Sequence, residues 1–465
     1  MSNYWLITYG CQMNRSDSER IATVLESIGY QPAIKEDEAD LILVNACSVR
    51  QPAIDRIWGQ TQKFKKLKKQ TSRFTPCNCS AIMKNKKLKT VLTGCILKKD
   101  KNKFNKVFDL IFNIRDLPKL PHLLSKSGIY NLKVSNYLEI TPKYQSSFSA
   151  FLPIMTGCNN FCTFCVVPYT RDREISRSAK EILCEVENLA KRGYKEIWLL
   201  GQNVNSYRYG EINFSKLLRI VNNVPGNFWI RFMSSHPKPS TRVELGAGPV
   251  PHRPAPEKSR CGAGAGDFSW DELIETMVNC KKVTGYLNLP VQSGDDEILK
   301  KMNRPYNIEE YKETIRKIME DVPDISLSTD VIVGFPGETE NNFQNTVRLF
   351  REIKFDMAYI AQFSPRPGTV AFELKDSVSH QEKERRWRIL TDTLKKTALE
   401  KNKNYLGKEI EVLVEENKNG FLIGKTKTYK TVKFRGDSNL VGQFIKVKIT
   451  QALPWGLRGE LKNGV

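Results

Sequence analysis

The 465-residue sequence lacks a hydrophobic run long enough to span a bilayer, and charged residues make up 27% of it. It also starts without the basic and apolar regions of an export signal, because residues 1–7 read directly into a strand. We therefore expect no membrane segment and a cytoplasmic location. In a reducing compartment the 11 cysteines should be thiols or metal ligands, and disulfides are disfavoured.

Acidic residues are scarce relative to basic ones, with 51 Asp and Glu against 73 Lys and Arg, a net charge of +22. A surplus of this size favours a polyanionic partner, nucleic acid before membrane, although a merely solvated basic surface is the alternative. The chain is too long for one ordinary core, so two to four domains are expected.

Three cysteines lie within eight residues: Cys158, Cys162 and Cys165. This spacing lets one short loop place three thiolates around an iron-sulfur cluster and leaves one iron open to a small molecule. A zinc loop is the first alternative, although zinc usually takes paired Cys-x2-Cys elements. Three unrelated buried cysteines are the second alternative.

The same stretch, with Phe164 before the last cysteine, resembles the radical S-adenosylmethionine (SAM) superfamily. The flanking residues 166–171, Val-Val-Pro-Tyr-Thr-Arg, narrow the resemblance to the methylthiotransferases, and similar segments recur along nearly the whole chain. Asp172 departs from the Gly that this family usually has, so the backbone after the cluster loop is open to question. Arg171 or Arg173 would have to neutralise that acidic side chain near a phosphate.

Residues 1–140 alternate apolar strands with helices and predict a small parallel, doubly wound α/β domain. Strands are expected at Tyr4–Tyr9, Leu41–Asn45, Lys89–Thr93 and Phe108–Asn113, with a helix at Ser16–Ile28. Three strands run into a cysteine: Cys11, Cys47 and Cys95. Loops after strands converge in such sheets, so these thiols can meet, although inert core cysteines are the alternative. The family resemblance implies that they hold an auxiliary 4Fe-4S cluster.

Two stretches depart from the family pattern. The basic residues 63–69 lengthen the N-terminal domain and are interpreted as an RNA-facing surface or a solvated helix face. The pair Cys77 and Cys79 in the same stretch is interpreted as loop cysteines, with competition for iron as the alternative. Residues 239–266 are rich in Pro, Gly and Ala without periodicity, which predicts a disordered or foreign insertion, and Cys261 within it is no ligand candidate.

Six βα units between residues 147 and 385 predict a partial (βα)6 TIM-like barrel. Strands are expected at Phe151–Met155, Glu196–Leu200, Trp229–Met233, Gly285–Leu289, Ser326–Val333 and Ala358–Phe363; helices near Ala179–Arg192, Trp270–Lys282, Glu309–Glu320 and Asn341–Ile353. Barrel enzymes keep their chemistry at the carboxyl ends of the strands. The expected SAM-binding residues there are Phe164, Gly201, Gln202, Asn203 and Gly334, and His236 is a weak acid/base candidate.

A helix at His380–Asn404 leads to alternating strands over residues 402–465, which predict a small antiparallel barrel resembling the TRAM domain, with an OB-like form. Its cations and aromatics suit phosphate contact and base stacking: Phe421, Lys425, Lys427, Tyr429, Lys430, Lys433 and Arg435. A domain that only stabilises the larger barrel is the alternative.

The resemblance implies an enzyme with two 4Fe-4S clusters that uses SAM to place a methylthio group on C2 of isopentenyladenosine at position 37 of tRNA. In that scheme Cys158, Cys162 and Cys165 hold the SAM-binding cluster, and sulfur comes from the auxiliary site. Threonylcarbamoyladenosine in tRNA, a ribosomal protein, and a non-catalytic iron-sulfur RNA-binding protein are the alternatives. The expected partners are the tRNA anticodon stem-loop and an electron donor such as flavodoxin or ferredoxin, with the enzyme a monomer.

Overall fold

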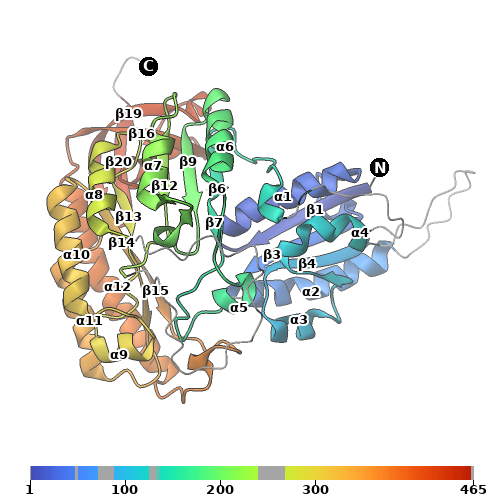
Figure 1. Cartoon of the computed structure of the whole chain (residues 1–465), viewed down its shortest axis with the longest axis horizontal. Helices are drawn as coiled ribbons and strands as arrows, with labels where there is room; N and C mark the ends of the chain where they lie inside the picture. The colour runs from blue at the N-terminus through green and yellow to red at the C-terminus, as the bar shows by residue number, and fades with distance from the viewer. Residues whose placement is uncertain are drawn as a thin grey trace, which may run out of the picture. The chain divides into compact units, whose positions relative to one another are not determined.

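The computed structural model describes residues 2–47, 51–71, 88–124, 134, 136–238 and 268–461 (Figure 1). The predictions for Cys77, Cys79, Cys261 and residues 239–266 therefore fall outside the described residues. The chain forms two compact units. Unit 1 comprises Met1–Gln145 with the segments Cys165–Asp172 and Arg366–Gly368, and unit 2 comprises the rest. No helix in the described ranges is both long and apolar enough for a bilayer.

Unit 1 is a parallel sheet in the order β2-β1-β3-β4-β5. Its strands are β1 (Ser2–Tyr9), β2 (Tyr30–Pro32), β3 (Leu41–Cys47), β4 (Lys89–Cys95) and β5 (Leu110–Ile111). Its helices are α1 (Gln12–Ser27), α2 (Gln51–Thr71), α3 (Lys98–Phe104), α4 (Leu120–Leu124) and α5 (Val167–Arg171). This order is that of a doubly wound fold, as expected.

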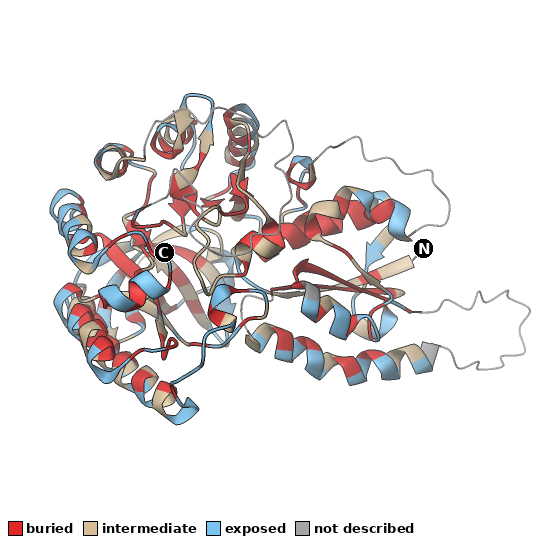
Figure 2. Ribbon diagram, turned by 60° about the horizontal axis from the view of Figure 1, so that its bottom comes forward, coloured by how far each residue is buried: buried red, intermediate tan, exposed pale blue. Residues whose placement is uncertain are grey.

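Helices cover both faces of the unit 1 sheet because alternate residues of its central strands point to opposite sides. Leu41 and Leu43 pack in a core with α1 and α4, whereas Ile42 and Val44 pack in a second core with α2 and α3. Both faces of β3 are buried, which explains its apolar run from Leu41 to Val44 (Figure 2).

Unit 2 contains six parallel strands in two hydrogen-bonded groups, β6-β9-β12 and β13-β14-β15. A parallel bridge joins Ile230 of β12 to Val283, which lies just before β13. These strands are β6 (Ser149–Pro153), β9 (Glu196–Leu200), β12 (Trp229–Phe232), β13 (Tyr286–Asn288), β14 (Ser326–Val333) and β15 (Met357–Gln362). Short strands flank them: β7 (Met155–Thr156), β8 (Ile175–Ser176), β10 (Arg208–Tyr209) and β11 (Ile212–Asn213). The predicted six-stranded partial barrel is confirmed.

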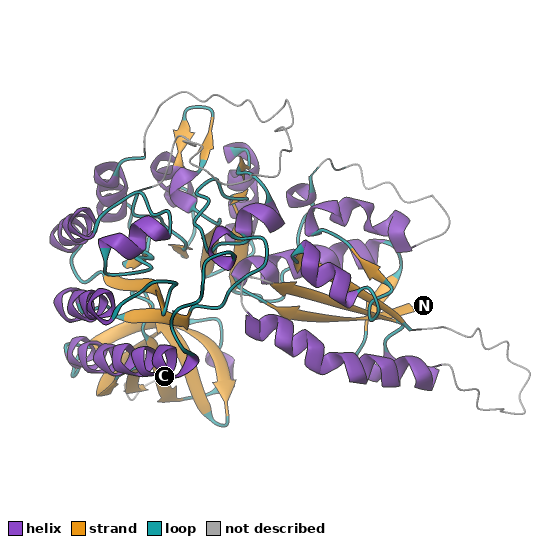
Figure 3. Cartoon of the chain, turned by 90° about the horizontal axis from the view of Figure 1, so that it is seen from below, coloured by secondary structure: helices purple, strands orange, loops and turns teal. Residues whose placement is uncertain are grey.

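Helices line the outside of these strands (Figure 3). They are α6 (Ala179–Lys191), α7 (Phe214–Asn222), α8 (Trp270–Asn279), α9 (Asp296–Lys301), α10 (Ile308–Asp321), α11 (Glu340–Ile353) and α12 (His380–Lys403). Side-chain caps start most of them: at α10, for example, Asn307 and Glu310 satisfy each other's backbone N–H groups. The bounds of the helices predicted in this region agree with the structure within a few residues, but the sequence predicted no helix at α7 or α9.

Five strands of unit 2 close into a small barrel in the order β16-β17-β18-β20-β19. They are β16 (Glu409–Lys418), β17 (Phe421–Thr426), β18 (Thr431–Arg435), β19 (Phe444–Leu453) and β20 (Gly456–Leu461). Inward-facing Val412, Leu422 and Phe434 are buried at its centre. The predicted C-terminal β-barrel is therefore confirmed, with one parallel pair, β18 and β20, in an otherwise antiparallel closure.

Candidate functional site

The three N-terminal cysteines lie at one edge of the unit 1 sheet. Cys47 and Cys95 are register partners at the ends of β3 and β4, and Cys11 follows the neighbouring strand β1 as the N-cap of α1. The connections from β1 and β3 lead to opposite faces of the sheet, so the strand order has its switch point between them. Ligands of doubly wound sheets bind outside the carboxyl ends at that point.

The sulfurs of these cysteines influence one another. The pKa of Cys95 is lowered to about 6, chiefly by a hydrogen bond with Cys47. Burial of the Cys95 thiol opposes this shift. Desolvation of its thiol, followed by the Cys95 sulfur, raises the pKa of Cys11. Within the described ranges, no three His, Cys, Asp or Glu side chains already have the spacing of a bound metal ion. Cys11, Cys47 and Cys95 are a set of neighbouring thiols at this edge of the sheet.

Two asparagines hold the backbone around this triad. Asn14 Oδ1 accepts from the backbone N–H of Cys11 at 3.2 Å, and Asn14 Nδ2 donates to Asn45 Oδ1 at 3.1 Å. Gly94 has φ +108°, and a Cβ there would lie 2.2 Å from a backbone oxygen of Ala46. The close strand approach needs glycine. Three soft sulfur donors held in this way suit an iron-sulfur cluster.

Arg171 enters the N-terminal triad from α5. Its Nε donates to Cys95 Sγ at 2.9 Å, its Nη1 to the Tyr137 hydroxyl at 3.2 Å, and its Nη2 to Asp17 Oδ2 at 2.5 Å. The next residue, Asp172, has φ +61°, a conformation that favours glycine. Its carboxylate pairs with Arg115. Arg115 is thus the cation beside Asp172, whereas Arg171, one of the two arginines considered from the sequence, pairs with Asp17.

The cluster loop of unit 2 carries Cys158, which is buried, and Cys162, which is partly exposed; Cys165 belongs to the segment assigned to unit 1. Gln202 Oε1 accepts from the backbone N–H of Gly157 at 2.6 Å, which ties the start of the loop to the end of β9. Arg304 Nη1 donates to Cys162 Sγ at 3.5 Å. The end of β9 and the segment after α9 thus support this loop.

Buried polar atoms without hydrogen-bond partners among the described residues gather after β9, β12 and β13. They are both amide atoms of Asn203, Asn205 Oδ1, Ser235 Oγ, His236 Nε2 and Ser293 Oγ. Buried polar groups normally have partners, so such a set at the carboxyl ends of barrel strands marks space for a polar ligand. Ser234 and Gln292 have φ +67° and +69°, strained conformations typical of functional sites.

His236 is held as a neutral ring. Desolvation, followed by the charge of Arg304, lowers the pKa of His236 well below its usual value. Its Nδ1 accepts from the backbone N–H of Lys238 at 3.2 Å, so the N–H proton of the neutral ring is on Nε2. The residue is therefore a hydrogen-bond donor at this strand end.

The predicted SAM-binding residues have different surroundings. Asn203 is 2% exposed with an unsatisfied amide, whereas Gly201 packs against Met155, 2.7 Å from the position of a Cβ. Phe164 packs against an apolar cluster that includes Phe335 and Phe363. Gly201 and Gln202 support the cluster loop, and Asn203 is the member of the set that offers open hydrogen bonds.

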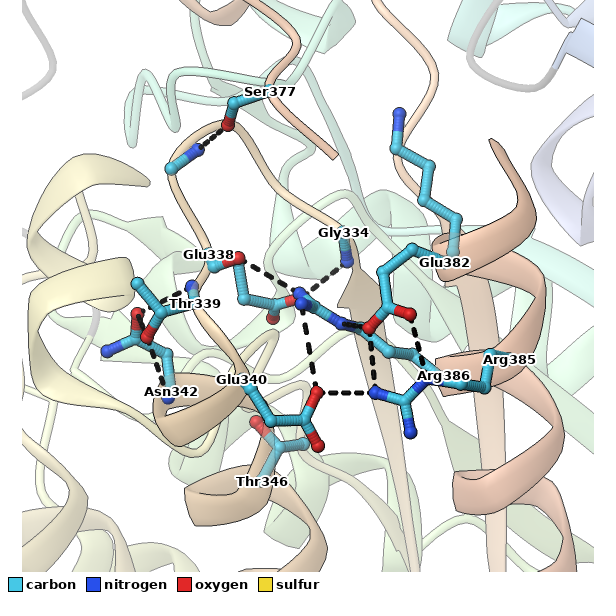
Figure 4. A network of polar contacts seen from close by, with 12 residues as sticks. Gly334, Glu338, Thr339, Glu340, Asn342, Thr346, Ser377, Glu382, Arg385 and Arg386 are labelled. Atoms are coloured by element: carbon cyan, nitrogen blue, oxygen red, sulfur yellow. Dashed lines mark hydrogen bonds and ion pairs between the residues drawn. The ribbon is translucent and has the colours of Figure 1, made fainter. Parts of the chain in front are cut away.

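Gly334 follows β14 within a buried polar network (Figure 4). Its N–H donates to Glu338 Oε2 at 2.6 Å, and Arg386 donates to the same oxygen at 2.7 Å. With φ +71°, Gly334 leaves room for Lys383, whose Cγ would lie 2.3 Å from a Cβ. The glycine is needed for packing against α12, and its role toward SAM stays a prediction.

Glu174 is a residue that the sequence did not single out. Its carboxylate accepts from Ser206 Oγ at 2.8 Å and from the backbone N–H of Asn159 at 3.4 Å. Burial raises the pKa of Glu174 to about 7. It joins the cluster loop to the segment after β9, and an isolated Glu fifteen residues along the chain carries no sequence signal for that contact.

The cations of the C-terminal barrel fall into two groups. Lys430 is 6% exposed and pairs with Asp356 at 2.7 Å, and Lys427 Nζ donates to the backbone oxygen of Lys281 at 2.6 Å. The prediction that Lys430 contacts RNA is wrong, because the turn between β17 and β18 is seated on the larger barrel. Lys433 and Arg435, by contrast, lie over the Phe421 ring at 4.1 and 5.6 Å on the outer face.

Comparisons with known proteins agree with this architecture. Residues 152–350 match the radical SAM superfamily, residues 3–113 match the uncharacterized protein family UPF0004, and residues 403–462 match the TRAM domain. The tRNA-2-methylthio-N(6)-dimethylallyladenosine synthase of Thermoanaerobacter sp. (strain X514) is 39% identical, with 98% of this chain and 92% of the relative covered. The chain belongs to the MiaB-type radical SAM methylthiotransferase family.

A second relative matches over nearly the whole length of both proteins. The protein of the same name from Dictyoglomus thermophilum is 38% identical over 477 residues, covering 99% of each chain. The relative from Clostridium perfringens (strain SM101 / Type A) is 38% identical, with 98% of this chain and 97% of the relative covered. This methylthiotransferase is therefore an enzyme of the radical SAM class, as the sequence predicts, and its family implies a 4Fe-4S cluster and SAM.

Proposed function

We propose that this enzyme transfers a methylthio group to C2 of N6-isopentenyladenosine at position 37 of tRNA. The observation that carries the proposal is the near full-length likeness to relatives named tRNA-2-methylthio-N(6)-dimethylallyladenosine synthase. The neighbouring thiols Cys11, Cys47 and Cys95 support it, because a sulfur-inserting enzyme needs a second metal site beside the one that serves SAM.

Cys158, Cys162 and Cys165 would hold the SAM-binding 4Fe-4S cluster, and the N-terminal triad would hold a second one. When bound, these groups supply the radical that opens the C2–H bond and the sulfur that replaces the hydrogen. The protein supplies orientation. The unsatisfied amide of Asn203 and the hydroxyls of Ser235 and Ser293 would hydrogen-bond the polar parts of SAM.

Packing beside the cluster loop would keep water away from the reacting atoms. Phe164 lies against Ile298, Met302, Phe335 and Phe363, all buried except for Phe164 itself. Excluding water protects a reactive radical from side reactions. Glu174 and Gln202 would hold the loop in place from the β9 side.

The tRNA anticodon stem-loop would contact the outer face of the small barrel. Phe421 and Arg435 are register partners on β17 and β18, and Lys433 is the register partner of Arg458 on β20, so these four side chains form one patch, the Phe421 patch. An aromatic ring with three cations suits phosphate contact and base stacking. We further propose a flavodoxin or ferredoxin as electron donor and a monomeric enzyme.

Mass analysis of tRNA nucleosides tests the substrate. Reconstituted enzyme receives SAM, a reductant and tRNA that carries isopentenyladenosine, threonylcarbamoyladenosine or unmodified adenosine. The proposal expects a methylthio product on the isopentenylated tRNA. Product on either of the other tRNAs alone would overturn the substrate assignment and leave the radical mechanism standing.

Cysteine variants separate the two metal sites in the same assay. Cys158→Ala should lose 5'-deoxyadenosine formation, whereas Cys47→Ala should keep it and lose methylthiolation. Cys184→Ala is the matched control, because Cys184 is an exposed thiol on α6 that belongs to neither set. Methylthiolated product from Cys47→Ala would refute the sulfur-donor role.

A further inference from the structure

Arg171 has an unusual allocation of its hydrogen-bond donors. It is 2% exposed, and the carboxylate that pairs with it, Asp17, is 1% exposed. Burying an ion pair costs free energy unless each partner is fully engaged. Nη2 and Nη1 are engaged by Asp17 and Tyr137, and the remaining Nε donates to the sulfur of Cys95.

Sulfur is a weak acceptor as a thiol and a far stronger one as a thiolate, because an ionised acceptor shortens and strengthens the bond. A buried guanidinium aimed at a cysteine therefore suits a sulfur that carries negative charge, as a metal ligand does. Asp17 and Tyr137 come from α1 and from the 3-10 turn Tyr137–Glu139 of the same unit, so two separate segments hold Arg171 at the sulfur.

The cluster loop of unit 2 contains a related contact between an arginine and a cysteine, but this arginine has no carboxylate partner among the hydrogen bonds of the described residues. Arg304 Nη1 donates to Cys162 Sγ, but its other donors reach the backbone oxygen of Pro290 and the hydroxyl of Tyr306. The acid partner of Arg171 is a carboxylate, whereas Arg304 donates to a neutral hydroxyl and a neutral backbone oxygen. The Cys95 sulfur thus receives a hydrogen bond from a guanidinium whose positive charge is offset by Asp17.

We propose that Arg171 is a positioning residue that sets the reduction potential of the cluster on Cys11, Cys47 and Cys95, and that Asp17 limits the positive charge which that cluster experiences. Hydrogen bonds to cluster sulfurs and local net charge are the levers by which a protein tunes such a potential. The inference rests on the proposed function in one respect, the presence of a cluster on this triad.

Two variants should move the potential in opposite directions. Asp17→Asn leaves the guanidinium without its counter-charge, so the reduced cluster is favoured and the potential rises. Asp17→Asn combined with Arg171→Met removes the neutral pair together with the Nε–H bond, so the potential falls. We expect each change to alter the reduced-to-oxidised ratio at fixed poise about tenfold, which is about 59 mV for a one-electron couple.

The measurement uses the full-length chain with Cys158, Cys162 and Cys165 all replaced by Ala, so that the N-terminal cluster alone is observed. Iron and sulfide content are assayed first, and the potential is then followed by electron paramagnetic resonance. The matched control is Asp116→Asn with Lys119→Met, an exposed ion pair of the same unit, which should leave the potential unchanged.

Opposite shifts in the two Asp17 variants support the proposal. Potentials equal to that of the parent chain, with iron retained, overturn it and leave the proposed function intact. If the double variant loses iron, Asp17→Asn alone decides, and a potential that stays or falls refutes the proposal. A parent chain without iron refutes the N-terminal cluster itself, and with it both the sulfur-donor role and this inference.

Discussion

Asn203 shows how a single residue can be costly to the free protein and useful to the liganded one. Its buried amide has no partner among the described residues. We expect Asn203→Ala to leave the free energy of unfolding unchanged or higher, and to weaken SAM binding by about tenfold to a hundredfold, the effect of a buried hydrogen bond of ~1–3 kcal/mol. Equilibrium dialysis with reconstituted enzyme measures the affinity.

The control for this prediction is Asn188→Ala, on the outer helix α6, where Nδ2 makes a long, exposed hydrogen bond to Cys184 at 3.8 Å. It should bind SAM as the wild type does. Unchanged SAM affinity in Asn203→Ala, with its cluster intact, would assign the unsatisfied amide to another ligand.

Arg231 is the second residue with a measurable individual effect. It is 0% exposed, pairs with Glu196 at 2.5 Å, and donates to the backbone oxygens of Thr426 and Lys427 at 2.7 and 3.0 Å. Arg231→Met should lower the free energy of unfolding by about 3–5 kcal/mol, because it leaves a buried carboxylate uncompensated. Urea unfolding monitored by circular dichroism measures this loss.

Adding Glu196→Gln to Arg231→Met should recover part of that loss, since the double variant no longer buries a lone charge. Arg219→Met removes an arginine from an exposed pair with Glu275 and should cost only about 0–1 kcal/mol. Equal losses for Arg219→Met and Arg231→Met would show that burial does not decide the effect.

At the scale of elements, strand β16 contains a bulge that carries an acidic side chain. The register shifts between Val414 and Glu416, so Glu415 is the extra residue. Desolvation, followed by the nearby Glu196 carboxylate, raises the pKa of Glu415 from 4.5 to about 7. The folded state therefore binds this proton more tightly than the unfolded chain does.

The sign follows from proton linkage: a folded state that binds more protons loses stability as pH rises. Unfolding free energy should fall between about pH 4.5 and 7, by at most about 3 kcal/mol from this group. Glu415→Gln should remove that part of the slope, whereas the exposed Glu181→Gln should not. Parallel pH profiles for Glu415→Gln and the wild type would contradict this assignment.

Elements with a strong local pattern could be predicted from the sequence, and weakly patterned ones could not. The apolar run of β3 and the 3.6-residue periodicity of α11 give nearly correct bounds. Strand β2 consists of Tyr-Gln-Pro, and its existence depends on pairing with β1. Cysteine spacing singled out Cys158, Cys162 and Cys165, and placement at strand ends singled out the N-terminal triad. The contact of Arg171 with Asp17 joins residues 154 positions apart and has no local signal.

At the scale of the whole molecule, the net charge of +22 predicts salt-sensitive binding of tRNA. Lys433→Ala with Arg435→Ala should weaken tRNA binding and reduce the slope of log affinity against log salt by about 2, one for each lost phosphate contact. Filter binding at a series of salt concentrations provides the slope. SAM cleavage without tRNA should be unaffected, because both side chains lie on the outer face of the small barrel.

Lys446→Ala with Lys448→Ala is the matched control, since this pair removes the same charge from β19, where the register partners are Glu411 and Glu409. It should change the slope less than the Phe421-patch variant does. An equal change in both double variants would mean that overall charge, and not the Phe421 patch, binds tRNA.

The way Arg231 holds the turn between β17 and β18 also limits how this protein can evolve. Arg231 binds two backbone carbonyls of this turn, and the buried Thr426 hydroxyl accepts from the backbone N–H of Lys430, so the shape of the turn must be kept. Tyr429 keeps φ +66° there and packs on Trp198 and Tyr286. A recombination event that joins the large barrel of one lineage to the small barrel of another should succeed only when it preserves this turn geometry.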